Sequence, residues 1–165
     1  MSPAVPWEES YLGRLRALTG PEPVLMTIGA RAVLRDDGGR VLLIQRNDNG
    51  RWALPAGTME LRQTLRDCAI REVYEETGLT AHTVTPFALY SGEHLHTNAF
   101  GATYQHVSLA VRVDSWSGDL VRVTDETLDA AFFPLDALPE DLSGSVRPTL
   151  ADLGRFESGD PFRLA

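Results

Sequence analysis

The sequence predicts an α+β domain, and three observations lead to this prediction. Segments rich in apolar and β-branched residues mostly follow one another without an intervening helix, so most predicted strands are adjacent in sequence. One strongly helical segment lies near the middle of the chain, and shorter helical patterns lie near both ends. The chain has 165 residues, 43% of them hydrophobic, which suits one domain with a substantial core. Because no repeat, low-complexity tract or interior linker divides it, we treat residues 1–165 as a single domain.

The N-terminal part contains one predicted helix and two predicted strands. Residues 10–18 carry apolar side chains at helical spacing, and the Gly-Pro pair that follows stops a helix, so residues 1–20 are expected to form a helical extension. Residues 24–34 and 41–45 are rich in apolar and β-branched side chains, and an Asp-Asp-Gly-Gly turn separates them. The simplest interpretation of the two segments is a β-hairpin.

The central helix is predicted over residues 64–77, with Gly78 at the position of a C-terminal cap. Residues 91–102 hold two histidines, two glycines and a glutamate, and are expected to form a loop or the tip of a long hairpin. Residues 143–165 are expected to form a C-terminal helix and tail, because Pro148 suits an early helical position and apolar residues follow at helical spacing. The remaining strand candidates are residues 83–90, 104–113 and 130–133.

The charge of the chain limits its expected partners. Lys and Arg total 15 and Asp and Glu total 23, which gives a formal net charge of −8. Such a chain repels phosphate backbones and anionic lipids, so we expect neither nucleic-acid binding nor membrane binding. An anionic small molecule remains possible if a metal ion lies between it and the carboxylates.

Three further features indicate a cytoplasmic protein. The N-terminal region lacks the apolar run of a secretory signal, and nowhere do eighteen uncharged apolar residues occur together. Cys68 is the single cysteine, which excludes an internal disulfide and fits a reducing compartment. Because Cys68 lies among apolar residues of the central helix, we interpret it as a packed, inert thiol.

The central helix carries acids on the side that should face the core. At about 100° per residue, two glutamates and three apolar side chains fall within about 100° of one another. This stripe consists of Leu65, Ala69, Glu72, Val73 and Glu76. Glu75 lies close enough to converge with the two glutamates, whereas Arg71 can pair with Glu75 but does not easily reach both acids of the stripe. Two buried carboxylates are costly unless a positive charge compensates them, and a hard divalent cation prefers carboxylate oxygens.

The segment 57–79 resembles the Nudix box. The pattern of that family is Gly, five residues, Glu, seven residues, Arg-Glu, an apolar residue, one residue, Glu-Glu, one residue, Gly and an apolar residue. Eight of its nine specified positions match, which is a specific signal over 23 residues. The matching residues are Gly57, Arg71, Glu72, Val73, Glu75, Glu76, Gly78 and Leu79. Looser similarity extends over about residues 25–140.

Two positions depart from the family pattern. Gln63 stands where the family has Glu, and Arg62 stands where many relatives have Gly. A glutamine amide can still accept a hydrogen bond through its carbonyl oxygen, but it lacks the charge that helps to hold Mg²⁺. We therefore expect weakened rather than abolished activity, with Glu60 available to partner basic residues or a second metal.

The resemblance implies an α/β/α sandwich with a mixed β-sheet and a central catalytic loop-helix-loop. It also implies hydrolysis of a diphosphate linkage in a nucleoside diphosphate derivative, with Mg²⁺ or Mn²⁺ as cofactor. The implied catalytic residues are Arg71, Glu72, Glu75 and Glu76, and the implied metal ligands are Glu72, Glu75, Glu76 and the backbone carbonyl of Ala56. Arg71 would hold the carboxylates in register through charge-assisted hydrogen bonds.

Other roles in the site are less defined by the sequence. Arg46 could bind the phosphates and Trp52 could stack on a base, although an exposed arginine and a core tryptophan are equally compatible with the sequence. The general base could be a glutamate of the box or a downstream acid. The downstream candidates are Glu93, Asp125 and Glu126. The histidines at 94, 96 and 106 do not have a zinc-binding spacing.

Substrate and assembly remain open. The sequence carries none of the markers after the box that distinguish subfamilies for nicotinamide dinucleotides, ADP-ribose or dinucleoside polyphosphates. An alternative function is a nucleotide-binding Nudix module with weak or lost catalysis because of Gln63. A homodimer formed through the N-terminal helix and residues 91–102 is a further possibility.

Overall fold

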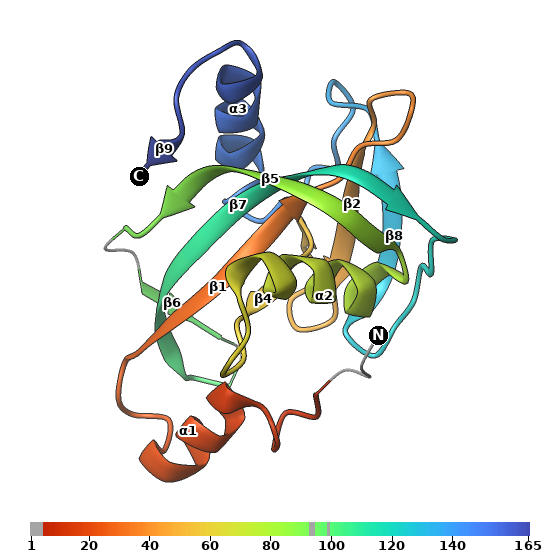
Figure 1. Ribbon diagram of the computed structural model, residues 1–165. Helices are drawn as coiled ribbons and strands as arrows, with labels where there is room; N and C mark the ends of the chain where they lie inside the picture. Colours follow the sequence, from red (N-terminus) through yellow and green to blue (C-terminus); the bar gives the residue numbers. More distant parts are fainter. Residues whose placement is uncertain (1–4, 93–94, 99) are drawn as a thin grey trace.

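The computed structural model describes residues 5–92, 95–98 and 100–165, and these residues form three helices and two β-sheets (Figure 1). The helices are α1 (Tyr11–Thr19), α2 (Leu65–Thr77) and α3 (Val146–Glu157). The strands are β1 (Leu25–Val33), β2 (Val41–Arg46), β3 (Trp52–Ala53), β4 (Ala56–Thr58), β5 (Thr80–Tyr90), β6 (Leu95–Thr97), β7 (Thr103–Ser117), β8 (Thr127–Phe133) and β9 (Arg163–Leu164).

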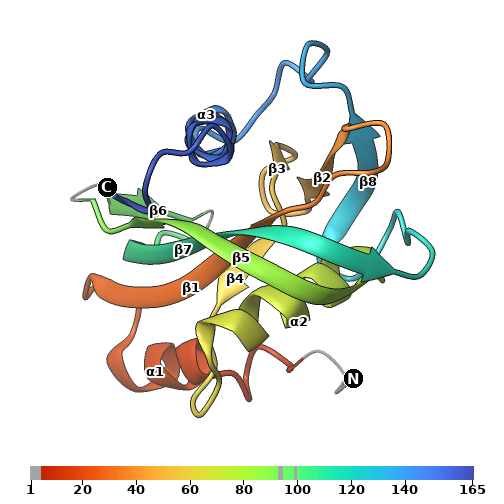
Figure 2. The same ribbon diagram turned by 45° about the horizontal axis from the view of Figure 1, so that its top comes forward.

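The larger sheet, called sheet A, is mixed, and the smaller sheet B is antiparallel. Sheet A has the order β4-β1-β7-β5-β9, with β6 paired to β7, and sheet B has the order β3-β2-β8. Strands β1 and β7 are parallel, whereas β5 and β7 are antiparallel. Figure 2 shows α2 on one side of sheet A and α3 on the other. This arrangement confirms the predicted α+β sandwich with a mixed sheet.

The core is divided between the two faces of sheet A. Side chains alternate between the faces of a strand, so β1 contributes Ala30 and Ala32 to the cluster under α2 and Val33 to the cluster under α3. Val73 of α2 is fully buried in the first cluster, and Leu153 of α3 is buried in the second. The two helices are therefore held by separate cores on opposite faces of one sheet.

The predicted helix boundaries agree with local capping. The Thr64 side chain accepts a hydrogen bond from the N–H of Asp67 at the start of α2, and Gly78 ends the helix with a left-handed φ of 72°. Ser10 caps α1 in the same way, because its side chain accepts from the N–H of Gly13. The segments predicted to be helical from periodicity and end signals are thus helical in the structure.

The predicted hairpin between residues 24–34 and 41–45 is wrong in its pairing. The turn exists, because the N–H of Asp36 donates to the carbonyl of Arg40 and an isolated antiparallel bridge joins Arg35 to Val41. Beyond that bridge, β1 pairs with β7 and β4, whereas β2 joins sheet B with β8 and β3. Both edges of β1 are occupied by β4 and β7, so β2 cannot pair along it as in a hairpin.

The C-terminal tail is held against sheet A by one buried acid. Asp152 of α3 accepts hydrogen bonds from the Tyr90 hydroxyl at 2.8 Å, from Arg163 at 2.9 Å and from Arg155 at 3.0 Å. Burial and then the bond to Asp152 raise the pKa of Tyr90 to about 12. Strand β9 pairs beside it with β5. This carboxylate is the centre of a fully paired network.

The described helices include none with both the length and the apolar character needed to cross a membrane.

Candidate active site

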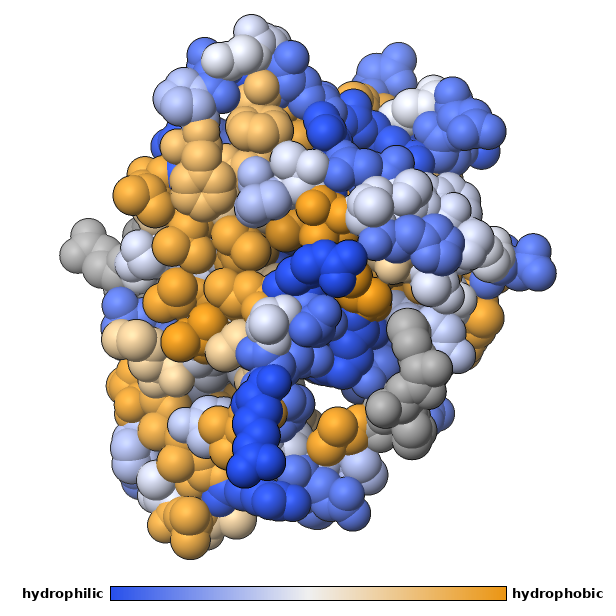
Figure 3. All heavy atoms as spheres, viewed as in Figure 1, coloured by the Kyte–Doolittle hydropathy of each residue, from blue (hydrophilic) through white to orange (hydrophobic). Residues whose placement is uncertain are grey.

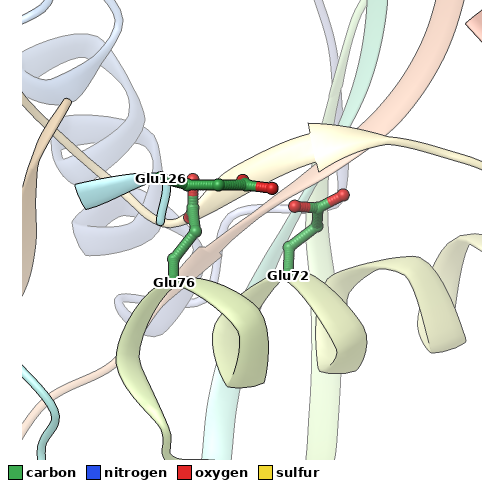
Figure 4. Close-up of side chains that lie close together, drawn as sticks. All are labelled: Glu72, Glu76 and Glu126. Carbon is green, nitrogen blue, oxygen red and sulfur yellow. The ribbon is translucent and has the colours of Figure 1, made fainter. Parts of the chain in front are cut away.

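Helix α2 presents two buried carboxylates on the side that faces the protein. Glu72 and Glu76 lie one turn apart and are 5% and 4% exposed. A third acid, Glu126, is exposed and lies directly before β8. Each of the three offers an oxygen within 4.8 Å of the others. Figure 4 shows their carboxyl groups turned toward one another, with two from α2 and one from the segment opposite.

Arg71 anchors this cluster to the end of β4. Its guanidinium lies 2.6 Å from Glu72 and 2.5 Å from Glu75, and it donates to the carbonyl of Thr58 at 2.8 Å. The predicted arginine bridge along the box is therefore present. Glu75 is turned to Arg71 and, among the described residues, it does not belong to the three-acid cluster, where Glu126 lies instead. Its role as a metal ligand stays a prediction.

Strand β4 forms the backbone side of the site. The N–H of Ala56 donates to Glu76 at 2.9 Å. Because the N–H and C=O of one strand residue point the same way, the carbonyl of Ala56 also faces Glu76. A Cβ at Gly57 would overlap the carboxyl group of Glu72. Glycine at this position gives the carboxylate its space.

Burial changes the acidity of the cluster. Burial raises the pKa of Glu72 to about 7, Arg71 opposes this shift, and the like charges of Glu75 and Glu126 add to it. The pKa of Glu76 is raised well above its ordinary value, first by burial and then by Glu72. Burial also raises the pKa of Glu126. Three carboxylates, of which Glu72 alone has an ion pair among the described residues, offer the oxygen donors that a hard divalent cation prefers.

The two departures from the box pattern lie in one turn. The side-chain carbonyl of Gln63 accepts from the N–H of Glu60 at 3.0 Å, and the N–H of Gln63 donates back to the Glu60 carbonyl at 3.1 Å. Arg62 has a φ of 65°, a conformation that glycine adopts without strain. The Glu60 carboxylate accepts from the N–H of Tyr11 at 2.7 Å and so joins the turn to the start of α1.

Arg46 lies near the cluster, whereas Trp52 belongs to the core. Arg46 donates two hydrogen bonds to Asp48, both 2.9 Å long. These bonds raise the pKa of Arg46, burial opposes this shift, and Asp48, Glu76 and Glu126 raise the pKa further by their negative charge. The Trp52 ring packs edge-on against Phe133, with 4.9 Å between centroids, in the cluster under α3.

The structure separates two of the base candidates. Glu126 joins the cluster, whereas Asp125 is exposed and uses its backbone carbonyl to accept from Asn47. Glu93 lies outside the described residues. The signal for Glu126 in the sequence is an acid pair directly before a strand, which does not by itself reveal the spatial neighbour.

Neither the cysteine nor any described histidine joins the cluster. His94 lies outside the described residues, and the rings of His96 and His106 lie 5.9 Å apart. Within the described ranges, the group of three potential ligands contains glutamates alone. Cys68 is fully buried, and burial raises its pKa to about 11, which fits a packed, inert thiol.

Comparisons with known proteins agree with this geometry. The sequence profile of the NUDIX domain matches residues 26–153. An ADP-ribose pyrophosphatase of Methanocaldococcus jannaschii is 29% identical over 123 residues, which cover 73% of this chain and 69% of that protein. A MutT-like protein of Streptomyces ambofaciens is 44% identical over 69 residues, which cover 42% of this chain and 44% of the relative.

A solved structure shows the same fold. The crystal structure of a MutT NUDIX hydrolase from Burkholderia pseudomallei superposes with a TM-score of 0.64 at 27% identity and covers 78% of this chain and 98% of that one.

Proposed function

Because the chain belongs to the Nudix family, we propose that it hydrolyses a diphosphate linkage in a nucleoside diphosphate derivative with Mg²⁺ or Mn²⁺. The single observation that carries this proposal is the convergence of Glu72, Glu76 and Glu126 within 4.8 Å. Two of these acids are buried, which is costly without a cation.

The donor set fits a divalent metal, and we assign each residue of the site a role. Glu72, Glu76 and the carbonyl of Ala56 would hold the ion, and Glu126 would complete the carboxylate set or take a proton from the attacking water. When bound, Mg²⁺ or Mn²⁺ neutralises the diphosphate and increases the acidity of water. Arg71 keeps Glu72 and Glu75 in position through its ion pairs.

Two predicted contacts with the substrate have different support. The position of Arg46 near Glu76 and Glu126 supports a role in binding phosphate oxygens, although Asp48 already pairs with it. The packing of Trp52 against Phe133 favours a core role over stacking on a base. We therefore propose that Arg46 binds the substrate and that Trp52 packs in the core.

The names of the relatives and the charge of the site support the proposed substrate class. One relative is called an ADP-ribose pyrophosphatase, and others are called MutT proteins. We propose a nucleotide-linked diphosphate, acted on in the cytoplasm. The lone Cys68, a buried free thiol, supports a reducing compartment.

Hydrolysis assays test the proposed reaction. The purified chain is incubated with ADP-ribose, nucleoside di- and triphosphates and dinucleoside polyphosphates, each with Mg²⁺, with Mn²⁺ or with a chelator. We expect release of a nucleotide or phosphate product from at least one compound, in the metal-containing samples alone. Absence of hydrolysis of every compound by folded protein overturns the proposal.

The homodimer stays a prediction with some support from the surface. Leu18 at the end of α1 is 85% exposed and Phe100 is 86% exposed. Figure 3 shows apolar side chains gathered on the left of the face that it views. Exposed apolar patches of this kind favour association. A monomeric mass at micromolar concentration by size exclusion with light scattering would contradict the dimer.

A further inference from the structure

Arg31 of β1 is a half-buried cation that none of the described carboxylates pairs with. Its Nε donates to the hydroxyl of Ser108 at 3.1 Å, and a terminal nitrogen donates to the hydroxyl of Thr149 at 3.2 Å. The guanidinium carbon lies 4.9 Å from the centre of the Tyr90 ring. In the part of the chain that the structure describes, no carboxylate forms an ion pair with Arg31. Its partners are two neutral hydroxyls and an aromatic face.

This environment is unfavourable for the free protein. Burial lowers the pKa of Arg31, and the neighbouring Tyr90 opposes the shift in part. Asp152 lies on the same helix as Thr149, but its carboxylate already accepts from Tyr90, Arg155 and Arg163. A guanidinium has five N–H donors, so two bonds to hydroxyls leave three for another acceptor. The side chain is thus fixed in direction and still able to bind.

Strand pairing places the backbone of Arg31 one strand away from the carboxylate cluster, with its side chain on the α3 side of sheet A. Arg31 lies directly opposite Ala56 in the antiparallel pair of β1 and β4, so the two side chains share one face of sheet A. Ala56 in turn donates its N–H to Glu76. Arg31 is therefore separated from the proposed metal ligands by a single edge strand.

A second arginine, Arg46, lies close enough to affect the pKa values of groups near Arg31 and in the carboxylate cluster. The pKa of His106 is lowered by burial and then by the positive charges of His96, Arg31 and Arg46, so these groups lie near one another. The negative charges of Glu76 and Glu126 also raise the pKa of Arg46. Arg46 is therefore close enough to influence both the carboxylate cluster and His106, which Arg31 also influences.

We propose that Arg31 binds an anionic group of the substrate, a phosphate or carboxylate that lies beyond the diphosphate to be cleaved. The proposal rests on the function proposed above, because it assumes that the diphosphate lies at Glu72 and Glu76. An oxyanion would accept hydrogen bonds from two N–H groups of the guanidinium and supply the negative charge that the described residues around Arg31 do not provide. Arg31 would then determine which nucleoside diphosphate derivatives are preferred.

Pairs of compounds that differ by one anionic group test this proposal. UDP-glucose and UDP-glucuronate differ by a carboxylate on the sugar, and NADH and NADPH differ by a phosphate on the ribose. For each compound, kcat and KM are measured with Mg²⁺ or Mn²⁺, and binding is measured by calorimetry. We expect the wild-type chain to favour the anionic member of at least one pair by about tenfold or more, as for hydrogen bonds to a charged group. A preference within the UDP-sugar pair would indicate a site for a carboxylate, and a preference within the nicotinamide pair would indicate a site for a phosphate.

Variants assign the preference to Arg31. Arg31→Gln should reduce the preference to about one, chiefly by raising KM for the anionic member. Arg31→Lys keeps the positive charge without the planar pair of N–H donors, and it should retain part of the preference. Thr149→Val removes one support of the guanidinium and should lower the preference about threefold. The matched control is Arg35→Gln, because Arg35 follows the same strand and already pairs with Glu157.

Three results would overturn the proposal. The first is a preference that Arg31→Gln leaves unchanged. The second is an equal loss of affinity for both members of a pair, which would indicate contact with a group that they share. The third is a wild-type chain that shows no preference, or no binding of either anionic compound. If no compound is hydrolysed, the proposed function fails, and the calorimetric ratios still decide the role of Arg31. If Arg31→Gln does not fold, the other two variants decide it.

Discussion

Two helices of this protein bury acids against the same sheet, and the acids are paired very differently. Asp152 of α3 accepts from Tyr90, Arg155 and Arg163. On α2, Glu72 and Glu76 face Glu126, and the ion pairs of this cluster come from Arg71 through Glu72. Asp152 accepts from three donors, whereas the three carboxylates of the cluster share one ion pair among the described residues, with Arg46 nearby.

The difference separates a structural acid from a functional one. A buried charge that serves stability is paired within the chain, since any unpaired charge costs several kcal/mol. A buried charge that serves a ligand must stay incompletely paired, because the ligand supplies the missing partner. Arg31 repeats the second pattern with the opposite sign, which is why its surroundings point to an anion.

The strongest way to break this comparison is to neutralise one acid of each kind. Glu76→Gln should lower kcat at least about a hundredfold, because even a group that only supports a metal ligand costs up to that much. It should leave the metal-free protein at least as stable as before, because it removes a buried negative charge. Asp152→Asn should lower the free energy of unfolding by about 1–3 kcal/mol and change turnover little. Steady-state kinetics and thermal unfolding measure both effects, and the reverse distribution would refute the assignment of roles.

A second test neutralises Glu126, the exposed acid of the cluster. Glu126→Gln should lower kcat by about tenfold or more, since the side chain supplies the third carboxylate. Manganese binding and the pH dependence of kcat together assign its part. Weaker binding of Mn²⁺ indicates a ligand, whereas unchanged binding with loss of the acidic limb indicates a proton acceptor. The matched control is Asp125→Asn, because Asp125 is the adjacent, exposed acid. A normal kcat for Glu126→Gln would remove Glu126 from the reaction.

The pH dependence of protein stability tests the buried charge of Glu72 without any substrate. The folded pKa of Glu72 is about 7, above its ordinary value of about 4.5. Between these values the folded state holds more protons than the unfolded state, so stability of the metal-free protein falls as the pH rises through this range. The loss from Glu72 is about 3 kcal/mol.

Added Mn²⁺ should therefore raise the unfolding temperature by several degrees at pH 8 and very little at pH 5. Differential scanning fluorimetry measures the effect. The Asp152→Asn variant should keep it, and Glu76→Gln should reduce it. An equal shift at both pH values would contradict a metal site built from these carboxylates.

The smallest expected effect concerns the substituted box position. Gln63 already accepts from the N–H of Glu60, a bond that a carboxylate would make in the same place. Gln63→Glu should therefore change kcat/KM by less than about threefold, and comparable rates remove the reason to regard the chain as a binding module. A large gain from a very low starting rate would instead support that alternative.

Much of the site follows from local pattern, because α2 carries its own caps and its own spacing. The positions of Glu72, Glu76 and Arg71 relative to one another are set by helical geometry, and Gly78 and Thr64 set the ends of the helix. The family resemblance supplies the sandwich and the mixed sheet. What failed was pairing across long distances: β1 and β2 looked like a hairpin but belong to different sheets.

The same limit applies to the third acid of the cluster and to Arg31. Glu126 reaches the cluster from a segment about fifty residues downstream, so its neighbours depend on how β8 joins β2. Arg31 receives its supports from Ser108 and Thr149, which lie 77 and 118 positions away. Two-residue strands such as β3 and β9 are also too short to carry a periodic signal.

The missing side chain at Gly57 has a consequence for how such enzymes diverge. The volume of one methyl group at this position is already occupied by the carboxyl group of Glu72. A lineage that acquired alanine there would displace the acid while keeping every glutamate in its sequence. The presence of the glutamates alone therefore does not show that a relative has kept the activity. A glycine at the position of Gly57 is a better indication.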